Sequence, residues 1–220
     1  VGAFGYRSDG IRANDETEHR IASAMLDVAV NEAVGVQFEA RGRHSDHDNL
    51  GHNFDRTEPT DIGRHQTREA TTRFGLRMAP AANTTVLLSV MQLRSTDIYD
   101  NLFPNFGVYF RDRYDYRGTQ SELQVLGRAS RWSWTLGLRY TDIGRRLLST
   151  FDTIPSPCPA PTCDTSSDVH QYAASAYGYA TWNPTRSLAL TAGAAYDTYK
   201  EAGAFDTSRI DPKLGLRWSP

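Results

Sequence analysis

The chain has 220 residues and a formal net charge of −2, a balance that gives no reason to expect a nucleic-acid partner. Its mean hydropathy is −0.54, and it contains no run of roughly 18 apolar residues, which excludes a transmembrane helix. A membrane β-barrel is compatible with this composition, because only alternate residues of a barrel strand face lipid. The length allows a single domain.

Alternation of apolar and polar residues with period 2 runs through the sequence and predicts β-strands. In the clearest strand, Val36 and Phe38 point one way, whereas Glu39 and Arg41 point the other. The sequence shows no helical periodicity. The pattern predicts ten strands, at about residues 1–6, 21–30, 36–43, 70–78, 85–95, 120–125, 132–141, 171–182, 188–197 and 213–218.

Two of these strands do not show a clean outward face. In the strand at 85–95, the predicted outward set is Leu87, Met91 and Leu93. The start of the same strand contradicts that assignment, because it also carries Val86, Leu88 and Val90. The strand at 171–182 alternates small and aromatic residues, so the pattern leaves its facing open.

The connections between the predicted strands alternate in length. Short connections at 31–33, 79–83, 128–131 and 183–186 alternate with long ones at 7–20, 45–66, 96–113 and 147–169. Outer-membrane barrels have this asymmetry, with short periplasmic turns and long extracellular loops. We therefore predict an all-β fold, an antiparallel transmembrane β-barrel segment of about ten strands in the bacterial cell outer membrane. The alternative is a soluble antiparallel sheet with one solvated face.

Aromatic and basic residues support the barrel. Aromatic side chains gather near strand ends, which suits a membrane interface: Trp132, Trp134, Tyr140, Trp182, Tyr196 and Trp218. Burying many charges in a soluble core would be costly, whereas a hydrated lumen removes that cost. The candidate lumen-lining residues are Arg41, Arg43, Arg73, Arg77, Arg139 and Arg217. They could guide anionic substrates, or, as we favour, pair with glutamates or pack against a plug.

Three predicted loops carry other candidates. Cys158 and Cys163 lie in a Pro/Ser/Thr-rich segment, where a small local disulfide in an oxidising compartment is favoured over two free thiols. The aromatic stretch at 99–110 could contact a ligand or pack loop against loop over the barrel mouth, and we favour packing. The loop with the most candidate metal ligands is interpreted as a solvated surface, not a metal site; it contains His44, Asp46, His47, Asp48, His52 and Asp55.

Three segments resemble the barrel of TonB-dependent outer-membrane receptors. The closest is RIDPKLGLRWSP at 209–220, which is similar to a strand and turn common in those barrels. NPTRSLALTAGAAYD at 183–197 resembles the strand before it, and YRSDGIRAND at 6–15 is a weaker match to a loop entry. The C-x4-C spacing in a long outer loop is also common in that family.

This resemblance implies uptake of a scarce nutrient, such as a metal chelate, a vitamin or an oligosaccharide. It also implies membrane lipid, a plug domain and the TonB energy-coupling complex as partners, and it implies no cofactor. The sequence shows no plug domain, no energy-coupling box and no aromatic carboxy-terminal strand signature. We therefore expect residues 1–220 to be part of one outer-membrane β-barrel domain, taken from inside a larger barrel.

Two other functions stay open at this point. A small self-contained barrel would act as a porin-like channel or an adhesin. An outer-membrane barrel enzyme would need acid and base residues at the barrel mouth, where His170 and Asp168 are the nearest candidates. The sequence contains no G-x-S-x-G, no H-E-x-x-H and no glycine-rich phosphate loop, so we expect no enzymatic activity.

Overall fold

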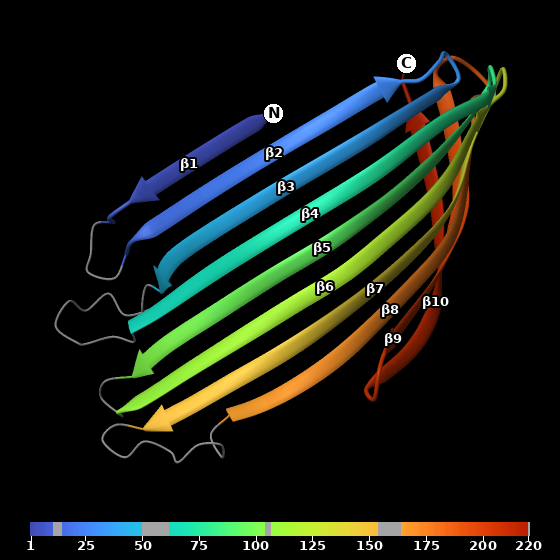
Figure 1. Cartoon of the computed structure of the whole chain (residues 1–220). Helices are drawn as coiled ribbons and strands as arrows, with labels where there is room; N and C mark the ends of the chain where they lie inside the picture. The colour runs from blue at the N-terminus through green and yellow to red at the C-terminus, as the bar shows by residue number, and fades with distance from the viewer. Residues whose placement is uncertain (11–14, 50–61, 104–106, 154–163, 220) are drawn as a thin grey trace.

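The computed structural model describes residues 1–10, 15–49, 62–103, 107–153 and 164–219. Ten antiparallel strands form one curved sheet, in which the spatial order of the strands is their order in the chain (Figure 1). The strands are β1 (Gly2–Ser8), β2 (Thr17–Ala29), β3 (Val34–Asn49), β4 (Ile62–Ala81), β5 (Thr84–Phe103), β6 (Val108–Arg128), β7 (Trp132–Thr153), β8 (Asp164–Trp182), β9 (Leu188–Glu201) and β10 (Phe205–Trp218). Among the described residues, no helix is long and apolar enough to cross a membrane.

The predicted all-β architecture with ten antiparallel strands is confirmed, and so is the grouping of connections at two ends of the sheet. The turn end holds residues 30–33, 82–83, 129–131 and 183–187. The opposite end, which we call the loop end, holds the described residues 9–10, 15–16, 107 and 202–204. In the first tight turn, Oδ1 of Asn31 accepts hydrogen bonds from the backbone N–H groups of Ala33 and Val34, both at 2.9 Å, which explains why Asn occupies that position.

The strands extend farther toward the loop end than the sequence predicted. β5 has 20 residues, β6 has 21 and β7 has 22. Parts of the predicted loops at 45–66, 96–113 and 147–169 are therefore strand. The prediction ended these strands early because polar residues occupy both faces beyond the apolar part, so the alternation disappears while backbone pairing continues.

One face of the sheet carries a continuous apolar belt near the turn end. Residues directly opposite each other in an antiparallel ladder share a face, so a cross-strand row defines it. One such row runs across β2 to β10 through Val28, Val36, Leu76, Leu88, Leu123, Leu138, Ala176, Tyr196 and Ile210. We name this the belt face and the opposite one the polar face. The neighbouring row on the polar face is Asp27, Gln37, Gly75, Ser89, Glu122, Arg139, Ser175, Asp197 and Arg209.

No residue that the structure describes covers the belt. Leu138 is 58% exposed and Ile210 is 69% exposed, and Ala189 is the only buried hydrophobic residue in the part of the chain that the structure describes. Soluble monomers rarely expose apolar patches larger than a few hundred Å², so a belt that crosses nine strands indicates an apolar surrounding.

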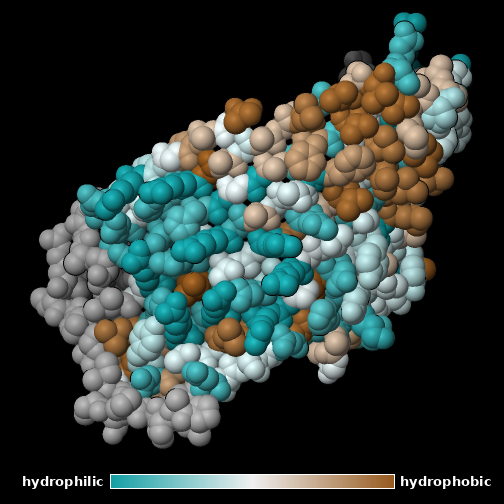
Figure 2. All heavy atoms as spheres, viewed as in Figure 1, coloured by the Kyte–Doolittle hydropathy of each residue, from teal (hydrophilic) through white to brown (hydrophobic). Residues whose placement is uncertain are grey.

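Aromatic rings mark the height of the belt. Trp132 and Trp182 are opposite each other at the turn end, and their rings stack at 5.8 Å with an interplanar angle of 15°. Tyr140 lies on the same face of β7 near the far edge of the belt. The interval from Trp132 to Tyr140 matches the roughly 9–11 residues that a tilted strand needs to cross a bilayer. Figure 2 shows hydrophobic residues gathered toward the turn end and hydrophilic ones toward the loop end.

The predicted facing of the fifth strand is wrong. Leu88 pairs with Leu76 and so belongs to the belt, whereas Leu87 pairs with Arg77 on the polar face. The polar face tolerates apolar residues here because they lie beside long arginine side chains; Nη2 of Arg73 is 3.6 Å from Sδ of Met91. In β8 the register resolves what the pattern left open, since Ala176 and Gly178 lie on the belt face. Its tyrosines at 177 and 179 lie on the polar face.

Candidate functional site on the polar face

The six arginines predicted to line a lumen all lie on the polar face of the sheet. The register places them in rows with other residues of that face, and they are spread from the turn end to the loop end: Arg41, Arg43, Arg73, Arg77, Arg139 and Arg217. The alternation of apolar and polar residues predicted that these arginines share a face. All six have odd numbers, and the odd-numbered positions of β3, β4, β7 and β10 point to the same side of the sheet.

Three of the six arginines pair with carboxylates, as the interpretation of a paired network requires. Arg43 is 2.9 Å from Glu69 on the next strand. Arg73 is 3.6 Å from Glu39, and Arg139 is 3.2 Å from Glu122. The other three, at positions 41, 77 and 217, form no ion pair with any residue that the structure describes. Half-exposed pairs of this kind contribute only about 0–1 kcal/mol each.

Glu122 is the centre of the tightest hydrogen-bonded group on this face. Oε1 of Glu122 accepts bonds from Oη of Tyr177 at 2.6 Å, Nε2 of Gln124 at 3.0 Å and Nη2 of Arg139 at 3.2 Å. These donors come from β6, β7 and β8, so the group ties three strands together. The sequence analysis named Arg139 but missed Tyr177, because the facing of β8 was ambiguous.

A second group lies toward the loop end of the polar face and consists of five rings in successive stacked or edge-on contact. We name it the ring ladder: His47, His65, Tyr99, Tyr114 and Tyr116. The rings of His65 and Tyr99 stack at 4.0 Å with an interplanar angle of 12°. Nδ1 of His65 is 3.3 Å from Nε2 of His47, and Tyr114 continues the ladder edge-on to Tyr99 at 5.9 Å. The ladder crosses β3, β4, β5 and β6.

The imidazole of His65 is held by a buried hydroxyl and a carboxylate. Thr67 is 7% exposed, and its hydroxyl donates to Oδ1 of Asp97 at 2.7 Å. Nε2 of His65 lies 3.3 Å from the Thr67 hydroxyl and 3.8 Å from Asp97. Burial and the neighbouring His47 lower the pKa of His65, although Asp97 acts in the opposite direction. His65 is therefore neutral at physiological pH and offers an apolar ring face.

The ladder contains residues that the sequence analysis assigned to loops. Tyr99 belongs to the aromatic stretch at 99–110, but it lies in β5 and stacks inside the sheet surface. His65 falls in the predicted loop at 45–66, yet it is in β4. The signal that could have found them is pairing: His47 and His65 become opposite partners once the two strands are extended through the loop end.

The predicted loop of histidines and aspartates separates onto the two faces. His44, Asp46 and Asp48 lie on the belt face, whereas His47 lies on the polar face. The remaining members, His52 and Asp55, lie outside the described residues, and so do Cys158 and Cys163 with their predicted disulfide. Among the residues that the structure describes, no group of three or more His, Cys, Asp or Glu could hold a metal ion.

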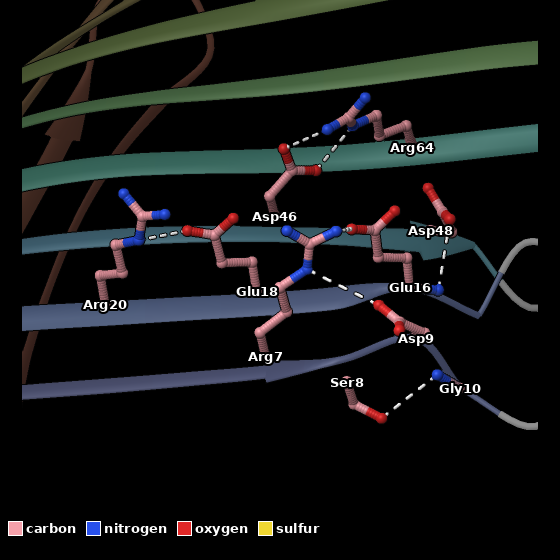
Figure 3. Close-up of polar contacts among 10 residues, drawn as sticks. All are labelled: Arg7, Ser8, Asp9, Gly10, Glu16, Glu18, Arg20, Asp46, Asp48 and Arg64. Carbon is pink, nitrogen blue, oxygen red and sulfur yellow. Dashed lines mark hydrogen bonds and ion pairs between the residues drawn. The ribbon is translucent and has the colours of Figure 1, made fainter.

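Exposed charges at the loop end of the belt face form ion pairs (Figure 3). Arg64 donates two bonds to the carboxylate of Asp46, at 2.7 and 2.6 Å, and this hydrogen bonding lowers the pKa of Asp46. Arg7 is 2.8 Å from Glu16, and Arg20 contacts Glu18. The two residues considered for an enzyme, at 168 and 170, also lie on this face, where Asp168 is 4.0 Å from Arg146.

Comparison with known families decides the class of the barrel. Residues 5–220 match the family model described as TonB dependent receptor-like, beta-barrel. The chain belongs to this family. The predicted resemblance to TonB-dependent receptors is therefore confirmed, and it covers nearly the whole chain.

Solved structures of several receptors and transporters have a similar fold. The ferric preacinetobactin receptor BauA from Acinetobacter baumannii has a TM-score of 0.72 at 12% identity, over 96% of this chain and 39% of that one. The copper transporter OprC has a TM-score of 0.74 at 11% identity, over 97% and 37%. The ferric citrate transporter FecA has a TM-score of 0.72 at 13% identity, over 96% and 34%. No curated protein sequence matches the chain.

The chain spans only part of the length of these solved structures. It covers less than two fifths of each of the three. Its ten strands curve without closing, and β1 and β10 each pair with one neighbour among the described strands (Figure 1).

Proposed function

We propose that this chain is part of the wall of an outer-membrane receptor that takes up a scarce nutrient, with residues 1–220 inside one barrel domain. The observation that carries the proposal is the family match over residues 5–220, together with a belt of transmembrane height on one face. In this arrangement the belt face contacts lipid and the polar face lines the lumen. The family and its solved members supply the outer-membrane location.

The nutrient is a small ligand that first meets the wall near the ring ladder. Stacked tyrosine and neutral imidazole rings provide flat contact area at low entropic cost, a surface suited to planar or ring-containing molecules. The named structures include receptors or transporters for ferric preacinetobactin, copper and ferric citrate. A metal ion or a metal chelate is therefore the ligand class that we propose first, before a vitamin or an oligosaccharide.

The lumen arginines have two roles in this proposal. The paired ones, such as Arg43 and Arg139, link neighbouring strands through Glu69 and Glu122. The arginines without a carboxylate partner among the described residues give the lumen wall positive charge, which favours anionic ligands such as carboxylate-bearing chelates. A plug domain and the TonB complex supply the energy coupling, as the resemblance implies.

Uptake measurements in the bacterium that encodes the protein test the proposal. We expect deletion of the gene to abolish accumulation of at least one radiolabelled metal or metal chelate, and the intact gene to restore it. An uncoupler of the proton-motive force should abolish the same uptake. Uptake that survives the uncoupler would instead establish a passive porin-like pore, and unchanged uptake of every ligand class would contradict the proposal.

The ring ladder offers a sharper test of the ligand contact. His65→Ala and Tyr99→Ala should weaken uptake by raising the ligand concentration for half-maximal transport, because the stacked surface is lost. Tyr196→Ala is the matched control, since that ring is exposed on the belt face and faces lipid in the proposal. Equal losses in the ladder variants and in the control would mean that barrel stability is affected instead of ligand contact.

A further inference from the structure

A group of arginines lies on the belt face just beyond the apolar belt. Arg94 in β5 and Arg117 in β6 are directly opposite each other in the register, and both side chains are exposed. Arg68 in β4 is exposed on the same face and is diagonal to Arg94. Like charges directly opposite each other destabilise a sheet, so an anion bound beside them would offset the repulsion.

Among the described residues, no carboxylate on this face lies within ion-pair distance of these three arginines, although Asp115 acts on Arg117 at longer range. Asp115 is the nearest acidic neighbour along β6, but its carboxylate accepts bonds from the Thr96 hydroxyl at 2.7 Å and from Arg113 at 3.0 Å. Within the described ranges, no ion pair involves Arg68, Arg94 or Arg117. By contrast, the arginines farther toward the loop end, such as Arg64, are matched by carboxylates.

The three arginines border an open hollow of about 1650 Å³. Its floor on the belt face consists of the small residues Ala22, Gly42 and Ala70, which form one row with Arg94. Because this floor has no long side chains, the hollow has room for a group larger than a water molecule. The hollow is therefore a depression on the belt face in which arginines outnumber the acidic residues Asp115, Asp142 and Asp168.

The height of the hollow matches the headgroup layer of a bilayer. On the belt face of β5 the run of aliphatic residues is interrupted after Val90, and Arg94 lies four residues farther along the strand. With a rise of about 3.3 Å per residue and a tilt of about 45°, Arg94 is about 9 Å above Val90. The polar layer on each side of a hydrocarbon core is roughly 5–8 Å thick. A long arginine side chain at the height of Arg94 can reach into this layer.

We propose that Arg68, Arg94 and Arg117 bind the phosphate groups of phosphorylated lipid headgroups in the outer leaflet of the membrane. The inference rests on the membrane placement in the proposed function. Guanidinium groups bind phosphate in a bidentate manner, and basic clusters at the membrane edge recognise anionic headgroups. A lipid is favoured over free phosphate because the apolar belt begins next to the hollow, where the opposite partners Phe74 and Val90 would contact its acyl chains.

The test uses the full-length receptor purified in detergent and native mass spectrometry. The probes are lipid A with both phosphates and the same lipid after phosphatase treatment. Wild-type receptor should bind the phosphorylated lipid at least tenfold more tightly than the dephosphorylated one. The Arg68→Gln/Arg94→Gln/Arg117→Gln variant should lose that preference. The matched control is Arg41→Gln/Arg77→Gln/Arg217→Gln, which removes the same charge from the polar face and should keep the preference.

Three outcomes would overturn the proposal: equal binding of both lipids by the wild type, a retained preference in the triple variant, or complete displacement of the lipid by millimolar inorganic phosphate, which would indicate a simple anion site. Should the triple variant fail to fold, the single Arg94→Gln and Arg117→Gln variants carry the same comparison. Uptake measured in the same variants separates the two proposals. A variant that loses the lipid preference but keeps uptake leaves the transport proposal intact. A variant that loses uptake but keeps the lipid preference leaves the lipid-site proposal intact.

Discussion

The ring of Tyr177 lies directly over Gly137, its opposite partner on the neighbouring strand. A methyl group at Gly137 would lie 2.1 Å from Cζ of Tyr177, so only glycine leaves space for the ring. From this position the Tyr177 hydroxyl reaches Glu122 on the next strand but one, at 2.6 Å. The same arrangement recurs where Tyr179 lies over Gly193. Glycines on the polar face thus position the tyrosines that join distant strands.

Substitution of Gly137 by alanine tests this relationship. The added methyl group must displace the ring of Tyr177, which breaks its bond to Glu122, and overpacking of this kind costs about 1–3 kcal/mol. We expect a lower midpoint in urea unfolding from lipid vesicles. Gly215→Ala is the control, because its methyl group would meet Thr191 at an ordinary 3.6 Å. Equal stability of the two variants would show that the ring moves without cost.

A lipid-facing charge tests the facing of β5. Leu88 is in the middle of the belt, so Leu88→Arg should destabilise the barrel by about 2–4 kcal/mol, the cost of arginine near the bilayer midplane. Ser89→Arg is the matched control on the polar face, where the new guanidinium would lie opposite Glu122. We expect it to change the unfolding free energy by less than about 1 kcal/mol. The reverse order of the two costs would restore the facing predicted from sequence.

The membrane-spanning part of the fold was predictable because one physical constraint governs it. Lipid requires an apolar residue at every second position, so Val36 and Phe38 or Leu136 and Leu138 stand out in the sequence. Beyond the belt, polar surroundings replace the lipid chains, so polar residues can occupy both faces, and the constraint ends although the backbone pairing does not. The strands therefore ended too early in the prediction, at the point where His65 and the ring ladder begin.

The candidate site could be predicted only in part for a related reason. The arginines of the polar face follow from alternation, since a residue such as Arg139 is flanked by Leu138 and Tyr140. The partners that give the site its geometry come from other strands, as Tyr177 does for Glu122. Register between strands depends on turn geometry and on which face is apolar, and in β8 both sides carried apolar residues.

The group around Glu122 should act as one unit. Tyr177→Phe removes the 2.6 Å bond, and Arg139→Gln removes the cation of the 3.2 Å pair. A hydrogen bond to a charged group contributes about 1.5–3 kcal/mol, so we expect Tyr177→Phe to cost at least about 1 kcal/mol at this half-exposed site. The double variant should lose less than the sum of the single losses, because both partners act through Glu122. Strictly additive losses in a double-mutant cycle would refute the coupling.

The protonation of His65 gives a test of the ring ladder that depends on pH. Burial and His47 lower the pKa of His65 below its ordinary value of 6.5, so the unfolded chain binds this proton more readily than the folded one. The contribution of His65 to stability is then fully present above pH 6.5 and is lost as the pH falls toward the lowered pKa. Histidine-selective NMR of the receptor in micelles should place the His65 midpoint below 6.5. His47→Gln should raise that midpoint by removing a positive neighbour, and Asp97→Asn should lower it further. A wild-type midpoint at or above 6.5, or a shift of the wrong sign in either variant, would mean that the ladder does not hold His65 as described.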